Sequence, residues 1–170
     1  MPAREAQARL QGALQWLTPD DARQAEYEVM VTDSLGTSAI EGEVLSTDAV
    51  RSSVARRLGI DKAGMVAAPR NVDGLVELLL DATRHYDQPL TARRLFVWQA
   101  ALFPAGHSGL NPIRVGEWRG DEPMQVISGP IGMPHVHYEA PPRDRVESEM
   151  HLFLEWFNQT LPHTVAPDAL

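Results

Sequence analysis

The residues with the clearest chemical potential form one short run, Thr37-Ser38-Ala39-Ile40-Glu41-Gly42. Thr37 and Glu41 are four positions apart, so both project from one face if the run is helical. Gly42 is suited to end such a helix. Glu41 then lies at the C-terminal end, where the helix dipole disfavours a carboxylate unless a cation pairs with it. On spacing alone, a solvated glutamate before a glycine cap is the commoner outcome.

A second group with chemical potential is the histidine pair His135 and His137. Residues two apart on a strand point to one side, so the two imidazoles could bind one metal ion. A zinc site needs at least one further protein ligand, and Glu139 is in phase, but the end of a strand holds a ligand poorly. We therefore predict exposed or packed hairpin histidines and no metal site.

Two arginine-containing segments allow both a functional and a structural interpretation. In Gly116-Glu117-Trp118-Arg119, the tryptophan could stack on a base while the arginine binds a phosphate. A tryptophan and an arginine are also common together at the edge of a core, and we predict a buried Trp118 with Arg119 bonded to nearby backbone. Arg56 and Arg57 are predicted to form a solvated helix end, where cations suit the dipole.

Six helices are predicted to position these residues, because apolar side chains recur at helical spacing. The second begins after Thr18-Pro19, a cap followed by a proline suited to the first helical position. It runs to Glu41. Ser46 or Thr47 caps the third, and Thr91 caps the fifth. The successive apolar faces are Leu10, Ala13, Leu14, Leu17; Tyr27, Met30, Val31, Leu35; Val50, Val54, Leu58; Val72, Leu75, Val76, Leu79, Leu80; Leu95, Trp98, Leu102; and Val146, Met150, Phe153, Leu154, Phe157.

The composition of the chain changes between residues 104 and 134, a segment that is rich in glycine and proline. Met124 to Ile127 and His135 to Tyr138 are short strand candidates, and Ser128-Gly129-Pro130-Ile131-Gly132 between them is turn material. The fold class predicted from these patterns is mainly α, a helical bundle with one β-hairpin.

The composition of the chain excludes several kinds of site and classes of protein. The chain has 170 residues, no cysteine, 44% hydrophobic residues and a formal charge of -8. Disulfides and thiolate metal sites are excluded, and the acidic charge argues against a general nucleic-acid-binding surface. No apolar run has the length of a membrane span, and the first residues lack the apolar segment of a signal peptide. We expect a cytoplasmic protein without membrane association.

The run from Thr37 to Gly42 resembles the inhibitory motif of Fic proteins, which is Ser or Thr, three residues, Glu, then Gly or Asn. Further segments similar to one Fic subgroup make the resemblance more specific and extend it over essentially the whole chain. They are Ser52 to Gly59, Leu102-Phe103-Pro104 through Val115-Gly116-Glu117-Trp118-Arg119, Met124 to Pro130, and Val136 to Pro142.

The chain departs from the family in one respect. The Fic signature, His-Pro-Phe, two residues, Asp or Glu, then Gly-Asn-Gly-Arg, does not occur in it. In the family this loop begins soon after the helix that here is expected to end near Thr160. We therefore expect a truncated chain with an incomplete Fic core, no catalytic residues and no AMP transfer of its own.

The resemblance implies that the complete protein transfers AMP from ATP, with Mg, to a hydroxyl of a target protein. It implies an N-terminal helical cap at residues 1–86 and the first part of a Fic core at residues 87–170. Thr37, Glu41 and Gly42 would be inhibitory, with the glutamate reaching an arginine of the missing loop. The implied target-binding flap, which would hold an extended segment by main-chain hydrogen bonds, consists of Met124, Gln125, Val126, Ile127, Ser128, Val136, His137 and Tyr138.

The expected partners are a target protein and a possible homo-oligomer, and ATP and Mg are expected only with the full-length protein. The alternative function is a non-catalytic helical module that regulates or binds a protein. A DNA-associated helical domain is disfavoured by the acidic charge.

Overall fold

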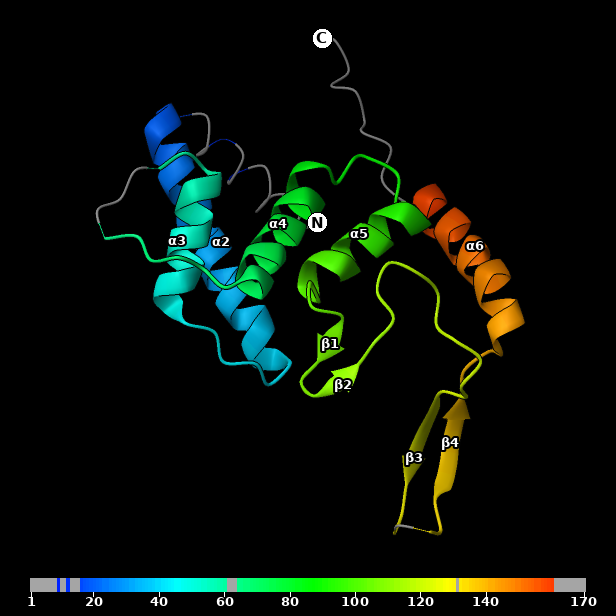
Figure 1. Ribbon diagram of the computed structural model, residues 1–170. Helices are drawn as coiled ribbons and strands as arrows, with labels where there is room; N and C mark the ends of the chain where they lie inside the picture. The colour runs from blue at the N-terminus through cyan, green and yellow to red at the C-terminus, as the bar shows by residue number, and fades with distance from the viewer. Residues whose placement is uncertain (1–8, 10–11, 13–15, 61–63, 131, 161–170) are drawn as a thin grey trace. The chain divides into compact units, whose positions relative to one another are not determined.

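The computed structural model describes residues 9, 12, 16–60, 64–130 and 132–160. The described chain is mainly α, as predicted, with two small antiparallel hairpins (Figure 1). It divides into two compact units, Met1–Ala82 and Thr83–Leu170. The assignment of residues 1–86 to a cap and 87–170 to a Fic core stays a prediction. The predicted first helix, with Leu10, Ala13 and Leu14, lies outside the described residues.

The described part of the first unit contains the helices α2, α3 and α4, and the first two of these begin with predicted capping residues. Helix α2, Pro19–Ile40, starts with a reciprocal capping box between Thr18 and Asp21. Helix α3, Thr47–Arg57, is capped by Ser46, whose hydroxyl accepts from the Ala49 N–H. Gly59 follows α3 with a positive φ of 66°, a conformation that glycine adopts without penalty. Helix α4, Arg70–Arg84, completes the set.

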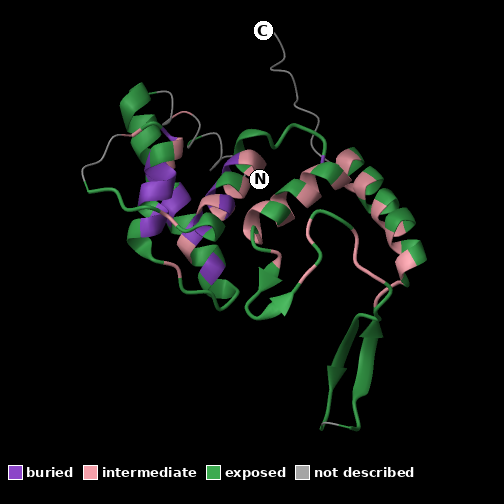
Figure 2. Ribbon diagram, in the orientation of Figure 1, coloured by how far each residue is buried: buried purple, intermediate pink, exposed green. Residues whose placement is uncertain are grey.

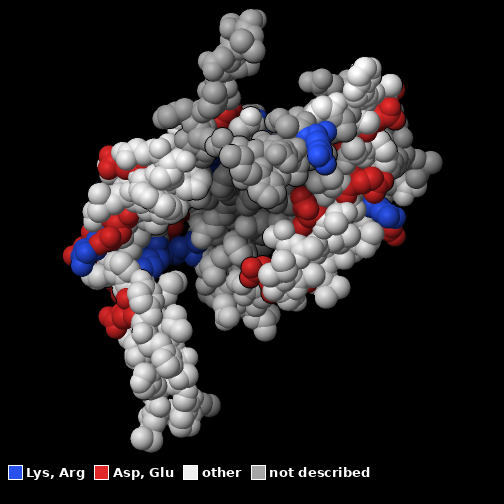
Figure 3. Space-filling model, turned by 180° about the vertical axis from the view of Figure 1, so that it is seen from behind, with Lys and Arg blue, Asp and Glu red and all other residues white. Residues whose placement is uncertain are grey.

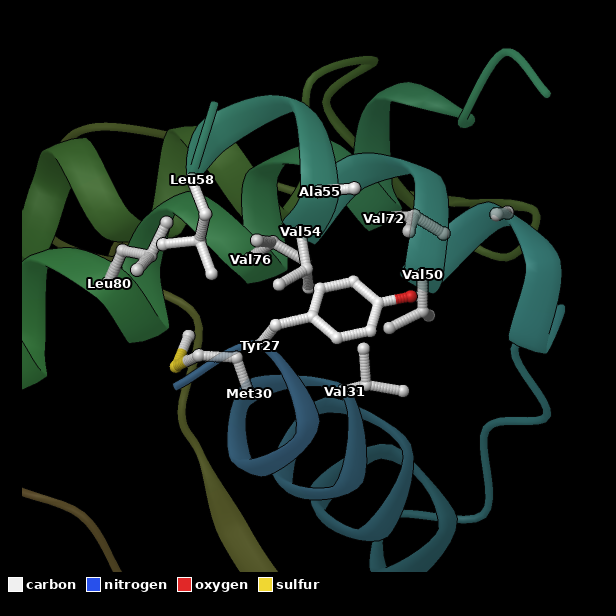
Figure 4. Close-up of a cluster of buried hydrophobic side chains, with 11 residues drawn as sticks. Tyr27, Met30, Val31, Val50, Val54, Ala55, Leu58, Val72, Val76 and Leu80 are labelled. Carbon is white, nitrogen blue, oxygen red and sulfur yellow. The ribbon is translucent and has the colours of Figure 1, made fainter. Parts of the chain in front are cut away.

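The core of the first unit lies where α2, α3 and α4 meet (Figure 4). The predicted apolar faces supply it, and Tyr27 from α2 packs its ring toward Val50 and Val54 of α3. Figure 2 shows the buried residues gathered on these three helices. The buried cluster consists of Tyr27, Met30, Val31, Ala49, Val50, Val54, Ala55, Leu58, Val72, Val76 and Leu80.

The second unit contains helix α5, Ala92–Leu102, and helix α6, Arg143–Thr160. Thr91 caps α5 as predicted, and neither helix has a buried residue. The side-chain amide of Asn158 on α6 bonds the main chain of Leu90 twice, accepting from its N–H at 2.8 Å and donating to its C=O at 2.9 Å. Asn158 therefore ties the end of α6 to the segment that leads into α5.

Two hairpins lie between α5 and α6. The first pairs β1, His107–Ser108, with β2, Asn111–Pro112. It was not predicted, because two-residue strands show no alternation of apolar and polar residues. The second pairs β3, Gln125–Ser128, with β4, His135–Glu139, and lies where the sequence predicted a hairpin.

Candidate functional site

Glu41 occupies the position that the sequence predicted, immediately after the last residue of α2. It is the C-cap residue, and its N–H points back to the carbonyl groups of Thr37 and Ala39. Gly42 follows with a φ of 80°, which explains why glycine ends this helix. Thr37 and Glu41 are both exposed and lie one turn apart. The three predicted inhibitory residues therefore form one accessible helix end.

The Glu41 carboxylate has no cationic partner among the described residues. The last turn of α2 contains no basic residue. Among the described residues, the Glu41 side chain makes no hydrogen bond or ion pair. A carboxylate at the negative end of a helix dipole is unfavourable without a positive partner. Two apolar side chains beside it are also almost fully exposed, Ile40 at 84% and Val44 at 97%. The Glu41 carboxylate and its two apolar neighbours are therefore accessible at this helix end.

The body of α2 fixes this helix end in the first unit. Tyr27, Met30 and Val31 are buried in the core. Two turns before Glu41, the buried Ser34 donates its hydroxyl proton to the Met30 carbonyl at 2.7 Å, and Ser38 is also buried. Because the core holds the same helix that presents Thr37 and Glu41, these two side chains are displayed from a packed element and not from a loop.

The residues predicted to form the flap lie on the β3–β4 hairpin or next to it. Every described residue of the two strands is exposed, including Val126 at 57% and Ile127 at 56%. Figure 3 shows the surface of this hairpin as almost entirely free of charged side chains toward its tip. Exposed apolar side chains on an isolated two-stranded hairpin are typical of a binding surface.

A β-bulge at His137 interrupts the ladder. Val126 is paired with Tyr138 and Ile127 with Val136, so His137 is the extra residue of β4. His137 Nε2 lies 2.6 Å from the Ser128 hydroxyl oxygen. Its ring centroid lies 4.5 Å from that of His135. Ser128, His135 and His137 therefore share one face of the hairpin.

The bulge also separates Glu139 from the two histidines. Glu139 accepts a hydrogen bond from the Gln125 side chain at 2.7 Å. Gln125 and Ser128 lie on opposite faces, because successive side chains of β3 alternate. Glu139 is thus on the face opposite His137, although the sequence suggested that both were in phase. In the described residues, no cluster of three or more His, Asp and Glu side chains is placed to hold a metal ion.

Arg119 bonds to nearby backbone, as predicted. Trp118 was predicted to be buried and is half-buried. Arg119 donates to the Glu122 carbonyl at 2.8 Å and to the Pro141 carbonyl. Trp118 meets Phe96 edge to face, with ring centroids 4.6 Å apart. The guanidinium of Arg119 therefore fixes the entry and exit of the hairpin, where β3 begins and β4 ends.

Arg57 differs from the prediction of a solvated helix end. Its guanidinium donates to Asp73 Oδ1 and to the Ser53 hydroxyl oxygen, both at 3.0 Å. Ser53 is completely buried and donates to the same Asp73 oxygen at 2.5 Å. Burial raises the pKa of Asp73, but the hydrogen bonds from Ser53 and Arg57 and the charges of Arg57 and Arg56 outweigh it, so the pKa lies below its usual value. Sequence reasoning missed this link between α3 and α4, because its partners lie far apart in the chain.

An open cavity of about 490 Å³ lies in the first unit against α2 and α3. Tyr27 forms part of its lining, and its charged groups are Glu28, Asp48 and Arg51. A nucleotide triphosphate needs several N–H donors or cations around its phosphates. Two carboxylates with one guanidinium do not fit that group, so the lining of this cavity is not suited to hold a nucleotide triphosphate.

No helix in the described part of the chain combines the length and apolar character needed to cross a membrane.

Comparison with known proteins gives one finding. The chain matches a domain of unknown function, DUF4172, over residues 2–60. This range is about a third of the chain and contains α2, the Thr37 to Gly42 run and α3. No curated protein matches the chain.

Proposed function

We propose that this chain is the N-terminal part of a Fic-family protein AMP-transferase and that Glu41 inhibits the complete enzyme. The observation that carries the proposal is the Glu41 side chain, exposed at the C-terminal end of α2 with no cationic partner among the described residues. In the Fic family, which this chain resembles, an arginine of the catalytic loop provides the cation that pairs with this glutamate. The DUF4172 match covers the proposed inhibitory motif but has no known function to add.

The inhibition follows from charge and geometry. A carboxylate that pairs with the loop arginine engages a cation otherwise available to the γ-phosphate of ATP. It also places negative charge near an anionic group, and like charges repel in a partly desolvated site. ATP would then bind in an unproductive position. The Glu41 carboxylate projects from the end of a packed helix. Its backbone is therefore already ordered before the arginine binds.

The direct test is the initial rate of AMP incorporation from α-phosphate-labelled ATP by the full-length protein. Replacing Glu41 by Gly is expected to raise the rate about 10-fold or more, which requires only about 1.4 kcal/mol of lost inhibition. Thr37→Ala is expected to give a smaller gain, because its hydroxyl can at most orient the helix end. Residues 1–170 alone are expected to transfer no AMP.

Glu43 provides the matched control. It is exposed, two positions beyond Glu41, and its main-chain N–H bonds the Ser38 carbonyl at 2.9 Å. Glu43→Gly removes the same charge from the same region and is expected to leave the rate unchanged. A lower rate for Glu41→Gly, with an unchanged circular dichroism spectrum, would show Glu41 to be catalytic or structural. Equal increases in the rate of AMP incorporation from both variants would show that the effect comes from surface charge in general and not from the position of Glu41.

A non-catalytic binding module is the second candidate function. The observation in its favour is the exposed apolar surface of α6, with Leu152 at 62% and Trp156 at 59% exposure. The labelling experiment separates the two candidates, because a binding module transfers no AMP in any variant.

A further inference from the structure

The cavity of the first unit combines a buried apolar lining with a wall that is held in place. Tyr27 and Ala55, which line it from α2 and α3, are only 2% and 0% exposed. Met65 and Val66 line it from the segment after α3, and the Val66 N–H donates to the Ser52 hydroxyl oxygen at 3.0 Å. Because Ser52 is buried in α3, this bond ties the segment to a packed helix. The volume of about 490 Å³ lies within the range of roughly 300–1,000 Å³ that is typical of small-molecule sites.

Three exposed charged side chains complete this lining, Glu28 from α2 and Asp48 and Arg51 from α3. Asp48 and Arg51 lie three positions apart on one face of α3, a spacing at which opposite charges often pair. Within the part of the chain that the structure describes, neither side chain makes an ion pair or a hydrogen bond. Glu28 accepts one bond, from Gln24 to its Oε1 atom at 2.8 Å, which leaves the other carboxylate oxygen open. All three charged groups therefore keep the capacity to bind a ligand.

The arrangement of these charges defines the ligand that would complement them. An α-ammonium and an α-carboxylate share one carbon atom, so they fit an anion and a cation that are also neighbours, as Asp48 and Arg51 are on α3. A second cation, separated from these groups by an aliphatic stem, fits the carboxylate of Glu28 on the other helix. The methylene groups of such a stem suit the apolar side chains of Met65 and Val66.

We propose that this cavity binds a free basic amino acid such as arginine or lysine. Its α-carboxylate pairs with Arg51, its α-ammonium with Asp48 and its side-chain cation with Glu28, each through charge-assisted hydrogen bonds. Two carboxylates and one guanidinium in the protein then meet two cations and one carboxylate in the ligand. The site lies in the first unit and does not depend on the proposed AMP transfer.

The test is a titration of residues 1–170 with L-arginine and L-lysine at constant ionic strength, followed by the chemical shifts of backbone amides. Saturable shifts are expected at Arg51, Met65 and Val66, with an affinity in the millimolar range or tighter for ligands of this size. Two analogues each lack one charged group: agmatine has no carboxylate, and L-norleucine has no side-chain cation. Agmatine should bind about 5-fold more weakly than L-arginine, and L-norleucine about 5-fold more weakly than L-lysine.

Variants of the charged residues assign each pairing. Arg51→Gln should weaken L-arginine binding about 5-fold and should not weaken agmatine binding, because agmatine has no carboxylate to pair with residue 51. Glu28→Gln should weaken L-lysine binding about 5-fold and leave L-norleucine binding unchanged, because L-norleucine has no side-chain cation. Asp33→Asn is the matched control, because Asp33 is an exposed carboxylate of the same helix α2. This variant should leave every affinity unchanged.

The amide spectrum of each variant also shows whether its fold is retained. If a variant loses the wild-type spectrum, the comparison of ligands and analogues on the wild type decides. Three results would overturn the proposal: no saturable shift with either amino acid, equal affinities for L-arginine and agmatine, or saturable shifts that do not include the cavity residues. A loss of binding in Asp33→Asn as large as that in Glu28→Gln would also overturn it, because the effect would then come from surface charge in general.

Discussion

The two units of this chain differ in how far they bury their apolar residues. In the first unit, α2, α3 and α4 enclose a continuous buried cluster in which Val50, Val54 and Val76 have no exposed surface. In the second unit, α5 and α6 contain no buried residue, and the strands are exposed throughout. Figure 2 shows this contrast along the chain.

Among the described residues, the first unit has a buried apolar core, and the helices of the second unit have no buried residue. Burial of apolar side chains is the main favourable contribution to folding. The first unit therefore has its own stabilising core and can present Glu41 from a firmly held helix. The second unit relies more on individual polar ties, such as Asn158 to Leu90 and Arg119 to the backbone at Glu122 and Pro141. Substitutions in the two units should therefore lower the free energy of unfolding by very different amounts.

The largest effect is expected from removing a core side chain of the first unit. Tyr27 is 2% exposed, and its ring packs toward Val50 and Val54. Tyr27→Ala should reduce the free energy of unfolding by about 3–5 kcal/mol, because it leaves a cavity as well as removing buried area. Urea unfolding followed by circular dichroism measures the change. A cost below about 1 kcal/mol would show that the first unit does not depend on this core.

A smaller but substantial effect is expected from the polar link between α3 and α4. Asp73→Asn replaces the carboxylate that accepts from Ser53 and Arg57 and leaves the Arg57 guanidinium, only 24% exposed, with Glu77 as its ion-pair partner. We expect a loss of about 1.5–3 kcal/mol by urea unfolding. Glu77→Gln is the matched control, because the Glu77 side chain is 70% exposed; its cost should be below about 1 kcal/mol.

The pH dependence of the same link has a defined sign. The pKa of Asp73 is lower in the folded protein than its usual value. Its carboxylate therefore stabilises the fold fully above the unfolded pKa of about 3.9, and this contribution is lost as the pH falls through the folded value. The wild type should lose stability below about pH 4 more steeply than Asp73→Asn. Parallel stability curves for the two proteins between pH 2 and 5 would contradict a lowered pKa.

The sequence predicted the local features of the fold well and the tertiary ones less well. Thr18, Ser46, Thr91 and Gly42 act through neighbours within about a turn, so their helix boundaries could be predicted from residue types alone. The Asp73 link joins residues 16 and 20 positions apart in the chain, and only packing brings these together. Arg57 was therefore taken for a solvated helix end.

The candidate sites show the same division. The placement of Glu41 at the end of α2 followed from its spacing to Thr37 and from Gly42. The strand positions of the hairpin followed from residue types and turn signals. The bulge at His137 did not, because a one-residue slip changes the face of every later side chain without any local signal in the sequence. That slip separates Glu139 from the histidines and makes the two hairpin edges unequal.

The smallest effect on stability is expected from the exposed aromatic side chains of α6, and it tests the other half of the comparison. Trp156 is as large as any core residue, but 59% of it is exposed. Its ring contact with Phe153 has a centroid distance of 6.0 Å. Trp156→Ala should change the free energy of unfolding by no more than about 0.5 kcal/mol. It should also reduce the fluorescence of an apolar dye such as anilinonaphthalene sulfonate, because that dye binds exposed apolar surface. A cost approaching that of Tyr27→Ala would mean that α6 packs against other residues in solution. The two units would then be equally dependent on apolar burial, and the contrast between them would not hold.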